Sequence, residues 1–457
     1  MRYYSPINTI EEGLMELQLL ITTDLTPQNW ETHPFAPDPG EENHVVNLYP
    51  EVSFETMEGF GGAVTDAAGY VYSLMNEAQK KELMDAYFSP ERMGYRLVRI
   101  PMDSCDFSTE LYEADSDPDD EKLEKFSFAR TEKYILPMLA DAQKAAGKPL
   151  ELMLSPWSPP AYMKTNSQRL HGGKLKPEYR ARWAEYICRY IKAFQERGYT
   201  VRRISMQNEP KAVQTWDSCV FTAQEQKEFL RDFMAPALAR NGLQDIEVFI
   251  WDHNKERVYE WMRDIADAET GHLVAGAAFH WYSGDHFEAL DLVRRLYPDK
   301  KLIISESCIE YSKFGSEDAA KQAMRLSHEI IGDLNHGMTA FYDWNLLLDE
   351  SGGPNHAGNL CLAPFLYDTK QKKLLPQLVQ RHFEHFSQYI VPGSVRIGCS
   401  KYTSELDVTA WKRPDGVIAV VILNRGAESQ TICLRLNGQA ASCELPAGSI
   451  ATGRIAL

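Results

Sequence analysis

The sequence lacks any long hydrophobic run. Its most apolar stretch, VIAVVIL at 417–423, is far shorter than the about 20 residues that a membrane-spanning helix needs. The opening residues, MRYYSPINTIEEGL, contain one basic residue but neither a continuous apolar core nor a cleavage site of small residues, so they do not match a signal peptide. We therefore predict no integral membrane segment and expect a cytoplasmic protein.

Cysteines are few, and none are arranged as metal or disulfide motifs. The eight cysteines stand at positions 105, 188, 219, 308, 361, 399, 433 and 443. No CxxC spacing occurs among them, so the sequence signals neither a zinc ribbon nor a disulfide framework. This cysteine usage is typical of a protein in a reducing compartment.

Basic residues are outnumbered by acidic ones. With 48 Lys and Arg against 65 Asp and Glu, the formal net charge is −17, so long-range repulsion disfavours nucleic acid as a partner. Aromatic residues are abundant at 11%, and tryptophan and tyrosine stack well on sugar faces and apolar ligands. The length of 457 residues allows one large domain with an appendage, or two to three average domains.

Eight short β-rich runs alternate with helical patterns along most of the chain. The runs end at EGFGGAVTDAA, YRLVRIPMDSCDFS, LELMLSPWSPP, VRRISMQNEP, IEVFIWDHN, VAGAAFHWYSG, KKLIISESC and GMTAFYDWN. Between them, segment 178–198 carries apolar residues at helical spacing, with Pro177 suited to its first turn and Gly198 to its C-terminal cap. Eight such units predict a closed (β/α)8 TIM barrel, whose strands all end on the face where active sites are built.

The pattern changes on both sides of the barrel. From about residue 386 the chain reads as period-two strands with a PDG turn at 414–416, which predicts a small antiparallel β-sandwich domain over 386–457. Residues 1–50 offer two further strands, at MRYYSPI and HVVNLYP, and we expect them to join the β domain. The barrel then occupies 51–385. The glycines at 59, 61 and 62 predict a close backbone approach at the first strand.

Two carboxylates end the fourth and seventh predicted strands, Glu209 in SMQNEP and Glu306 in SESC. Each alone suits an ordinary loop. Together, at the mouth of one barrel, they are the pair that glycoside hydrolysis requires, in which one protonates the leaving oxygen and the other attacks the anomeric carbon or activates water. A separation of about 5–5.5 Å predicts retention and one of about 6.5–9.5 Å predicts inversion. The amide of Asn208 is suited to hydrogen-bond a sugar 2-hydroxyl.

The ordered set of strand endings, together with DWNLLLDESGGPN and HFSQYI, resembles the acid β-glucosidases (glucosylceramidases) of glycoside hydrolase family 30 from about residue 58 to 390. The resemblance implies a retaining, exo-acting enzyme for a β-glycoside or glycolipid, with Glu306 as nucleophile, Glu209 as general acid/base, and no metal or cofactor. It also implies substrate-binding roles for seven residues: Asp106, Trp157, Asn208, His280, Tyr282, Trp344 and Asn359.

Three alternatives stay open. A relative could act on another β-linked sugar, as a β-xylosidase or a β-1,6-glucanase. A cysteine hydrolase could pair Cys308 or Cys105 with His280, since a thiolate nucleophile needs a nearby imidazole. A non-catalytic sugar-binding barrel is the third. Asp252 and His253 could suggest a metal pair, but no third ligand stands at metal spacing, and we assign them a supporting role.

The proposed division of roles predicts that the two carboxyls titrate apart. Glu209 should have the higher pKa, because the charge of Glu306 and the aromatic walls of the site both disfavour its ionisation.

Overall fold

The computed structural model describes residues 15–26 and 28–456. The strand predicted at MRYYSPI lies outside the described residues. The chain forms two compact units: one combines the described residues up to Ser53 with those from Ile397, and the other is Phe54–Arg396. Residues 386–396, which the sequence analysis placed with the β domain, belong to the second unit.

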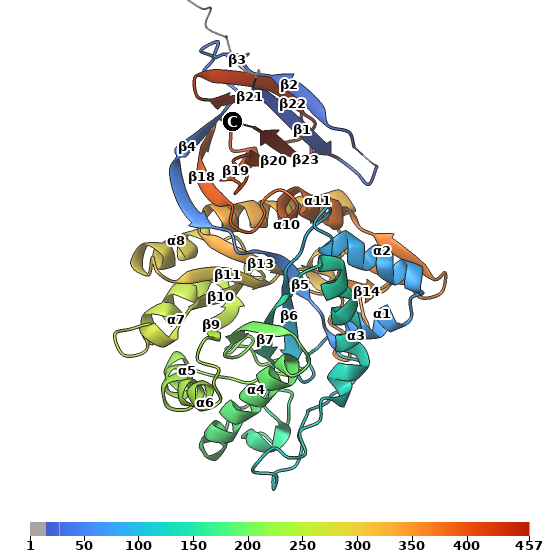
Figure 1. The fold of residues 1–457 in the computed structure, drawn as a ribbon, viewed down its shortest axis with the longest axis vertical. Coiled ribbons are helices and arrows are strands. Elements are labelled where there is room, and N and C mark those ends of the chain that lie inside the picture. Colours follow the sequence, from blue (N-terminus) through green and yellow to red (C-terminus); the bar gives the residue numbers. More distant parts are fainter. Residues whose placement is uncertain (1–14, 27, 457) are drawn as a thin grey trace, which may run out of the picture. The chain divides into compact units, whose positions relative to one another are not determined.

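The second unit is a closed barrel of eight parallel strands (Figure 1). Each strand forms in one of the eight predicted runs, and their order around the barrel is β5–β6–β7–β8–β9–β10–β11–β13. The TIM-barrel prediction is therefore confirmed. The bounds are β5 Gly59–Ala63, β6 Leu97–Met102, β7 Glu151–Pro156, β8 Thr200–Ser205, β9 Glu247–Asn254, β10 Gly276–His280, β11 Lys301–Glu306 and β13 Met338–Asp343.

Helices and short strands lie between the barrel strands or follow the last of them. The helices are α1 Asp66–Ser73, α2 Glu77–Phe88, α3 Ala129–Ala146, α4 Arg180–Gln195, α5 Ala223–Phe229, α6 Ala235–Arg240, α7 Val258–Ile265, α8 Phe287–Leu296, α9 Tyr311–Phe314, α10 Ala319–Asn335 and α11 Leu378–Ser387. The short strands are β12 Ile309–Glu310, β14 Leu347–Asp349, β15 Cys361–Leu362, β16 Phe365–Asp368 and β17 Lys373–Pro376.

Helix α4 shows how local sequence sets an element's bounds. The predicted helix over 178–198 begins with a 3₁₀ turn at Pro177–Tyr179 and continues as α4 to Gln195. It ends earlier than predicted because Gly198, at φ +83°, has already left the helical region, and its N–H turns back to the carbonyl of Gln195 at 2.9 Å. The buried face is the predicted one, with Trp183, Tyr186, Ile187, Tyr190, Ile191 and Phe194.

The barrel interior is filled by side chains. One layer comprises Leu97, Met153, Phe249, Ala278, Ile303, Ala340 and Tyr342. Arg203 lies buried near the N-terminal ends of the strands, where its guanidinium is 2.6 Å from Glu58 and 3.4 Å from Glu247. At the first strand, a Cβ on Gly61 would lie 1.8 Å from the carbonyl oxygen of Leu97, so the close approach predicted from the glycines is confirmed.

The first unit is a ten-stranded β assembly in the order β2–β1–β23–β20–β19–β18–β4–β21–β22–β3. N-terminal strand β1 pairs antiparallel with β23, and β4, which includes the predicted HVVNLYP strand, pairs parallel with β21. The prediction of a β domain built from both ends of the chain is thus confirmed. The bounds are β1 Glu16–Thr22, β2 Glu31–Pro34, β3 Ala36–Pro37, β4 Val45–Thr56, β18 Val395–Lys401, β19 Leu406–Lys412, β20 Ile418–Asn424, β21 Gln430–Leu436, β22 Gln439–Leu445 and β23 Ser449–Ile455.

The predicted PDG turn joins β19 to β20. Gly416 takes φ +86° and its N–H donates to the carbonyl of Arg413 at 3.0 Å. Within the described residues, no helix has the length and apolar character to cross a membrane.

Candidate active site

A pocket at the carboxyl ends of the barrel strands brings together eight of the nine predicted site residues. Counted with its open mouth it holds about 650 Å³, within the range of small-molecule sites. The predicted residues that line it are Asp106, Trp157, Asn208, Glu209, Tyr282, Glu306, Trp344 and Asn359. The ninth, His280, is fully buried beneath them.

Arg99 on β6 is a central residue that the sequence analysis missed. It is fully buried, and it donates to Glu306 Oε2 at 2.6 Å, to Asn208 Oδ1 at 2.8 Å and to Asp252 Oδ2 at 2.9 Å. A guanidinium has donors in a rigid fork, so it can fix three acceptors from three strand ends at once. The signal was an arginine inside the apolar run LVRIPM, since a buried arginine needs acidic partners.

Glu306, at the end of β11, is held by two donors. Besides Arg99, the hydroxyl of Tyr282 donates to Glu306 Oε1 at 3.0 Å, and only 8% of the residue is exposed. Burial, together with the charge of Glu209, raises the pKa of Glu306, although His280 and Arg99 oppose the increase. One carboxylate oxygen of Glu306 is thus held by the permanent charge of Arg99 and the other by the hydroxyl of Tyr282.

Glu209 follows β8 in a backbone conformation that is uncommon for residues other than glycine, with φ +46°. Its Oε1 lies 3.3 Å from Nδ1 of His280, whose Nε2 is 3.1 Å from Asp252 Oδ1. Asp252 also has positive φ, +59°, and such strained residues cluster at functional sites. The unfavourable backbone conformation of Glu209 therefore directs its carboxylate toward His280 and the pocket.

The histidine reverses the titration order expected from the sequence. Burial disfavours a charge on His280, but Glu306, Asp252 and Glu209 outweigh it and raise its pKa to about 9. Burial likewise raises the pKa of Glu209, yet its contacts with His280 and His253 prevail and lower it to about 2. The prediction that Glu209 has the higher pKa is wrong for the ligand-free site, because it left out a cationic imidazole beside this carboxylate.

Aromatic rings and the carboxyl of Asp106 also line the pocket. Trp157 and Trp344 stack with ring centroids 5.2 Å apart, and the Arg99 guanidinium lies 4.8 Å from the Trp157 ring. The amide of Asn359 donates to Asp106 Oδ2 at 3.2 Å. Burial and the charge of Glu306 raise the pKa of Asp106 to about 8 despite this hydrogen bond.

Several pocket residues were not predicted. His253 and Asn254 are the last residues of β9, and the others follow strand ends in loops or short elements: Phe107, Gln214, Trp216, Cys308, Glu310, Lys313 and Cys361. Among them, Gln214 contacts Glu209, with its Nε2 3.5 Å from Oε2 of that carboxylate. Loop residues carry little periodic pattern, so the sequence offered no signal for most of them.

The thiols near the site do not have the character of nucleophiles. Burial raises the pKa values of Cys308 and Cys105 well above the ordinary value, whereas a nucleophilic cysteine needs a lowered pKa. Sγ of Cys308 lies 3.4 Å from the hydroxyl of Tyr282. Asp252 binds Arg99, Ser205, Ser305 and His280, and therefore supports other site residues.

The two glutamates Glu209 and Glu306, in one pocket at the mouth of a TIM barrel, are the arrangement of a glycoside hydrolase. Residues 57–390 match the Glycosyl hydrolase family 30 TIM-barrel domain, and residues 393–453 match the Glycosyl hydrolase family 30 beta sandwich domain. The chain belongs to glycosyl hydrolase family 30.

Similar proteins come from animals, fungi and bacteria. The chain is 32% identical over 402 residues to lysosomal acid glucosylceramidase of Mus musculus, with 84% of this chain and 78% of the relative covered. It is 26% identical over 442 residues to an endo-1,6-beta-D-glucanase of Trichoderma harzianum, with 91% and 87% covered. The crystal structure of SrfJ from Salmonella typhimurium has a TM-score of 0.93 and 33% identity, with 97% of this chain and 100% of that chain covered.

Proposed function

We propose that this glycoside hydrolase is a retaining, exo-acting β-glucosidase of the glucosylceramidase type. Its substrate is a β-glucoside, including one linked to a lipid. The similarity of 84% of the chain to a lysosomal acid glucosylceramidase supports this sugar and this linkage. Glu306 is the nucleophile and Glu209 the general acid/base in the proposed mechanism.

The observation that carries the proposal is the different environment of the two carboxylates. Glu306 is pinned by Arg99 and Tyr282, so it is oriented for attack on the anomeric carbon. Glu209 contacts an imidazole that carries a proton, which suits a group that must give and take one. A retaining cycle needs these two roles at the same time.

In the proposed mechanism the Glu209–His280 pair holds the proton for the leaving group. Because the pKa of His280 is about 9, the imidazole is protonated in the free enzyme at neutral pH. Its Nδ1 is 3.3 Å from Glu209 Oε1. Glu209 relays this proton from His280 to the leaving oxygen in the same step in which Glu306 forms the glycosyl ester. Water then attacks the ester while Glu209 takes a proton from that water, which restores the protonated Glu209–His280 pair.

Asp106, Asn208, Trp157, Trp344 and Asn359 bind the sugar in this proposal. Indole rings stack on the apolar faces of a pyranose, and the carboxyl and amide groups bind its hydroxyls. Asn208 is fixed by Arg99 at 2.8 Å, so its amide nitrogen is free to face the 2-hydroxyl.

Trapping of the glycosyl-enzyme tests the proposal. The protein is incubated with 2-deoxy-2-fluoro-β-glucosyl fluoride, digested and mapped by mass spectrometry. We expect one added fluoroglucosyl group, on the peptide that contains Glu306. A label on Glu209, or turnover without any trapped ester, contradicts the assignment.

A second candidate specificity is a β-1,6-glucan, because one similar protein is an endo-1,6-beta-D-glucanase. A panel of aryl β-glucoside, β-xyloside and a β-1,6-linked glucose oligomer separates the candidates. If the protein prefers the oligomer and cleaves its internal bonds, it is an endo-acting β-1,6-glucanase, and the proposal of an exo-acting β-glucosidase is wrong. Binding of these sugars without any hydrolysis supports the non-catalytic alternative.

We also propose that the protein works in a reducing, cytoplasmic setting. All eight cysteines are free thiols in the structure. Alkylation of the protein as isolated from its source cells, denatured without reductant, should label all eight.

A further inference from the structure

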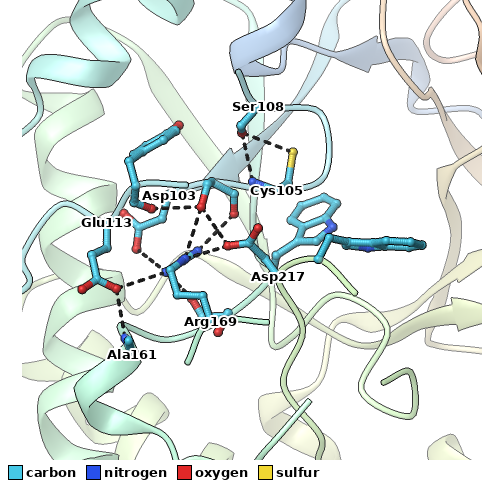
Figure 2. A network of polar contacts seen from close by, with 12 residues as sticks. Asp103, Cys105, Ser108, Glu113, Ala161, Arg169 and Asp217 are labelled. Carbon is cyan, nitrogen blue, oxygen red and sulfur yellow. Dashed lines mark hydrogen bonds and ion pairs between the residues drawn. The ribbon is translucent and has the colours of Figure 1, made fainter. Parts of the chain in front are cut away.

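Arg169 is the centre of a buried polar network that joins three loops at the barrel mouth (Figure 2). The loops follow β6, β7 and β8. Arg169, from the loop after β7, lies 3.4 Å from Asp103 and 3.8 Å from Glu113, both from the loop after β6. Its Nε donates at 2.6 Å to Asp217 Oδ1, in the loop after β8. Burial of this many charged groups demands that each has a partner.

Asp217 has one oxygen that the network leaves for a further contact. Oδ1 accepts from Arg169 and, at 2.7 Å, from the hydroxyl of Ser104. Oδ2 is buried, and Nε2 of His356 lies 3.4 Å from it. The side chain of Asp217 is fully buried and that of His356 is 14% exposed. This carboxylate oxygen is therefore aimed at an imidazole from a fourth segment.

His356 belongs to segment 350–360, which connects β14 to β15. Its ring Nδ1 is 3.3 Å from the carbonyl oxygen of Ser108, and its backbone N–H donates to the carbonyl of Asp106 at 3.2 Å. With both ring nitrogens facing acceptors, the imidazole satisfies both contacts only when it is protonated. The ring thus ties its segment both to Asp217 and to the loop that carries Asp106.

Three residues further on, the same segment delivers a sugar-binding amide. Asn359 donates to Asp106 Oδ2 at 3.2 Å, and both residues line the pocket. The side chain of Asn355 accepts from the backbone N–H groups of Ala357, at 2.8 Å, and Asn359, at 3.2 Å. The turn is therefore internally bonded, and a displacement of His356 moves Asn359 with it.

We propose that His356, as a cation bound to Asp217, is a positioning residue that locks segment 350–360 over the pocket and so sets the affinity for the sugar. The idea rests on the proposed function for the ligand, but the lock itself is a property of the free protein. The reacting bond is not touched by His356, so its loss should weaken binding more than it slows chemistry.

The charges around His356 make the lock dependent on pH. The groups that face it are Asp217, with Arg169 behind it, and Asp106. Burial opposes a charge on His356, but the hydrogen bond and charge of Asp217 outweigh it and raise its pKa. A raised pKa means that the lock is complete below the ordinary value of 6.5 and is lost as pH increases through the raised pKa.

Hydrogen exchange of the unliganded protein tests the lock directly. In the wild type, exchange of peptides covering 351–360, corrected for intrinsic rates, should increase as pH increases above the ordinary histidine pKa. In His356→Gln it should be faster by about tenfold at slightly acidic pH, the effect of losing one hydrogen bond to a charged group, and should no longer vary with pH. The matched control is His328→Gln, which removes a histidine of α10 that lies outside the pocket, 3.3 Å from Asp285.

Steady-state kinetics on 4-nitrophenyl β-glucoside give the second readout. We expect His356→Gln to raise KM about tenfold at slightly acidic pH with kcat changed by less than about threefold, and His328→Gln to change neither. Equal exchange in wild type and His356→Gln at every pH overturns the lock, as does a loss in kcat with KM unchanged. A wild-type protein inactive on this substrate contradicts the proposed function alone, because the exchange result stands without turnover.

Discussion

His280 bridges two carboxylates, with Nε2 3.1 Å from Asp252 and Nδ1 3.3 Å from Glu209. A charged imidazole in this place lets three carboxylates and Arg99 share one buried site without a large net charge. In the proposed mechanism, the acid/base function then belongs to the pair Glu209 and His280. The titration behaviour of the enzyme should then be that of the Glu209–His280 pair and of Glu306.

The first prediction is the shape of the pH profile. We expect a bell-shaped plot of kcat/KM against pH. Its alkaline limb should lie at about pH 9, where the Glu209–His280 pair loses its proton. The acidic limb belongs to Glu306, whose raised pKa means that activity is lost already above the ordinary glutamate value as pH falls. Measurement of kcat/KM across the stable pH range checks both limbs. If kcat/KM shows no alkaline limb, the Glu209–His280 pair does not supply the proton for the leaving group.

The second prediction concerns the anion that keeps His280 charged. Asp252→Asn preserves the shape but removes a negative charge 3.1 Å from the imidazole, so the pKa of His280 should fall. The alkaline limb should move down by about one pH unit, the effect of one hydrogen bond to a charged group. The control Asp264→Asn changes an exposed carboxylate beside Arg263 and should leave the profile in place.

Much of the barrel could be predicted from sequence because its strands are buried and short. Each apolar run ended in polar residues, and the closed sheet places all those ends on one face. This is why Glu209 and Glu306, almost a hundred residues apart, could be placed in one pocket without coordinates.

Contacts between segments could not be predicted in the same way. Arg99 looked like any arginine in a strand, and only the structure shows that it faces Glu306, Asn208 and Asp252. The predicted order of the Glu209 and Glu306 pKa values was wrong for the same reason, because it depends on the side chain that lies beside Glu209. His356 and Asp217 stand in loops without periodic pattern, and their pairing follows from tertiary structure alone.

The third prediction assigns the two glutamates by stereochemistry. Removal of the nucleophile in Glu306→Gly lets azide attack the face that the carboxylate used, which gives an α-glycosyl azide from an activated β-glucoside. In Glu209→Ala, azide should replace water on the glycosyl ester and give the β-glycosyl azide. Without azide, Glu209→Ala should lose about 10²- to 10⁴-fold in activity on poor leaving groups. Product analysis by proton NMR decides, and the opposite anomers would exchange the two roles.

The last prediction concerns Arg99 as a structural cation. Arg99→Met keeps much of the side-chain volume but leaves Asp252 and Glu306 as buried carboxylates without their permanent counter-charge. Breaking a buried ion pair from one side costs about 3–5 kcal/mol, so the free energy of unfolding should fall by that amount.

Denaturant unfolding of the barrel unit, followed by tryptophan fluorescence, measures this change. The control is Arg202→Met, whose guanidinium is half exposed and pairs with Glu247 at 3.1 Å, and which should cost less than about 1 kcal/mol. The loss in Arg99→Met should shrink at low pH, because protonation neutralises Glu306 and removes part of the uncompensated charge. If Arg99→Met is as stable as the control at every pH, Asp252 and Glu306 take up protons without cost when the cation is lost. Arg99 then serves only to orient Glu306.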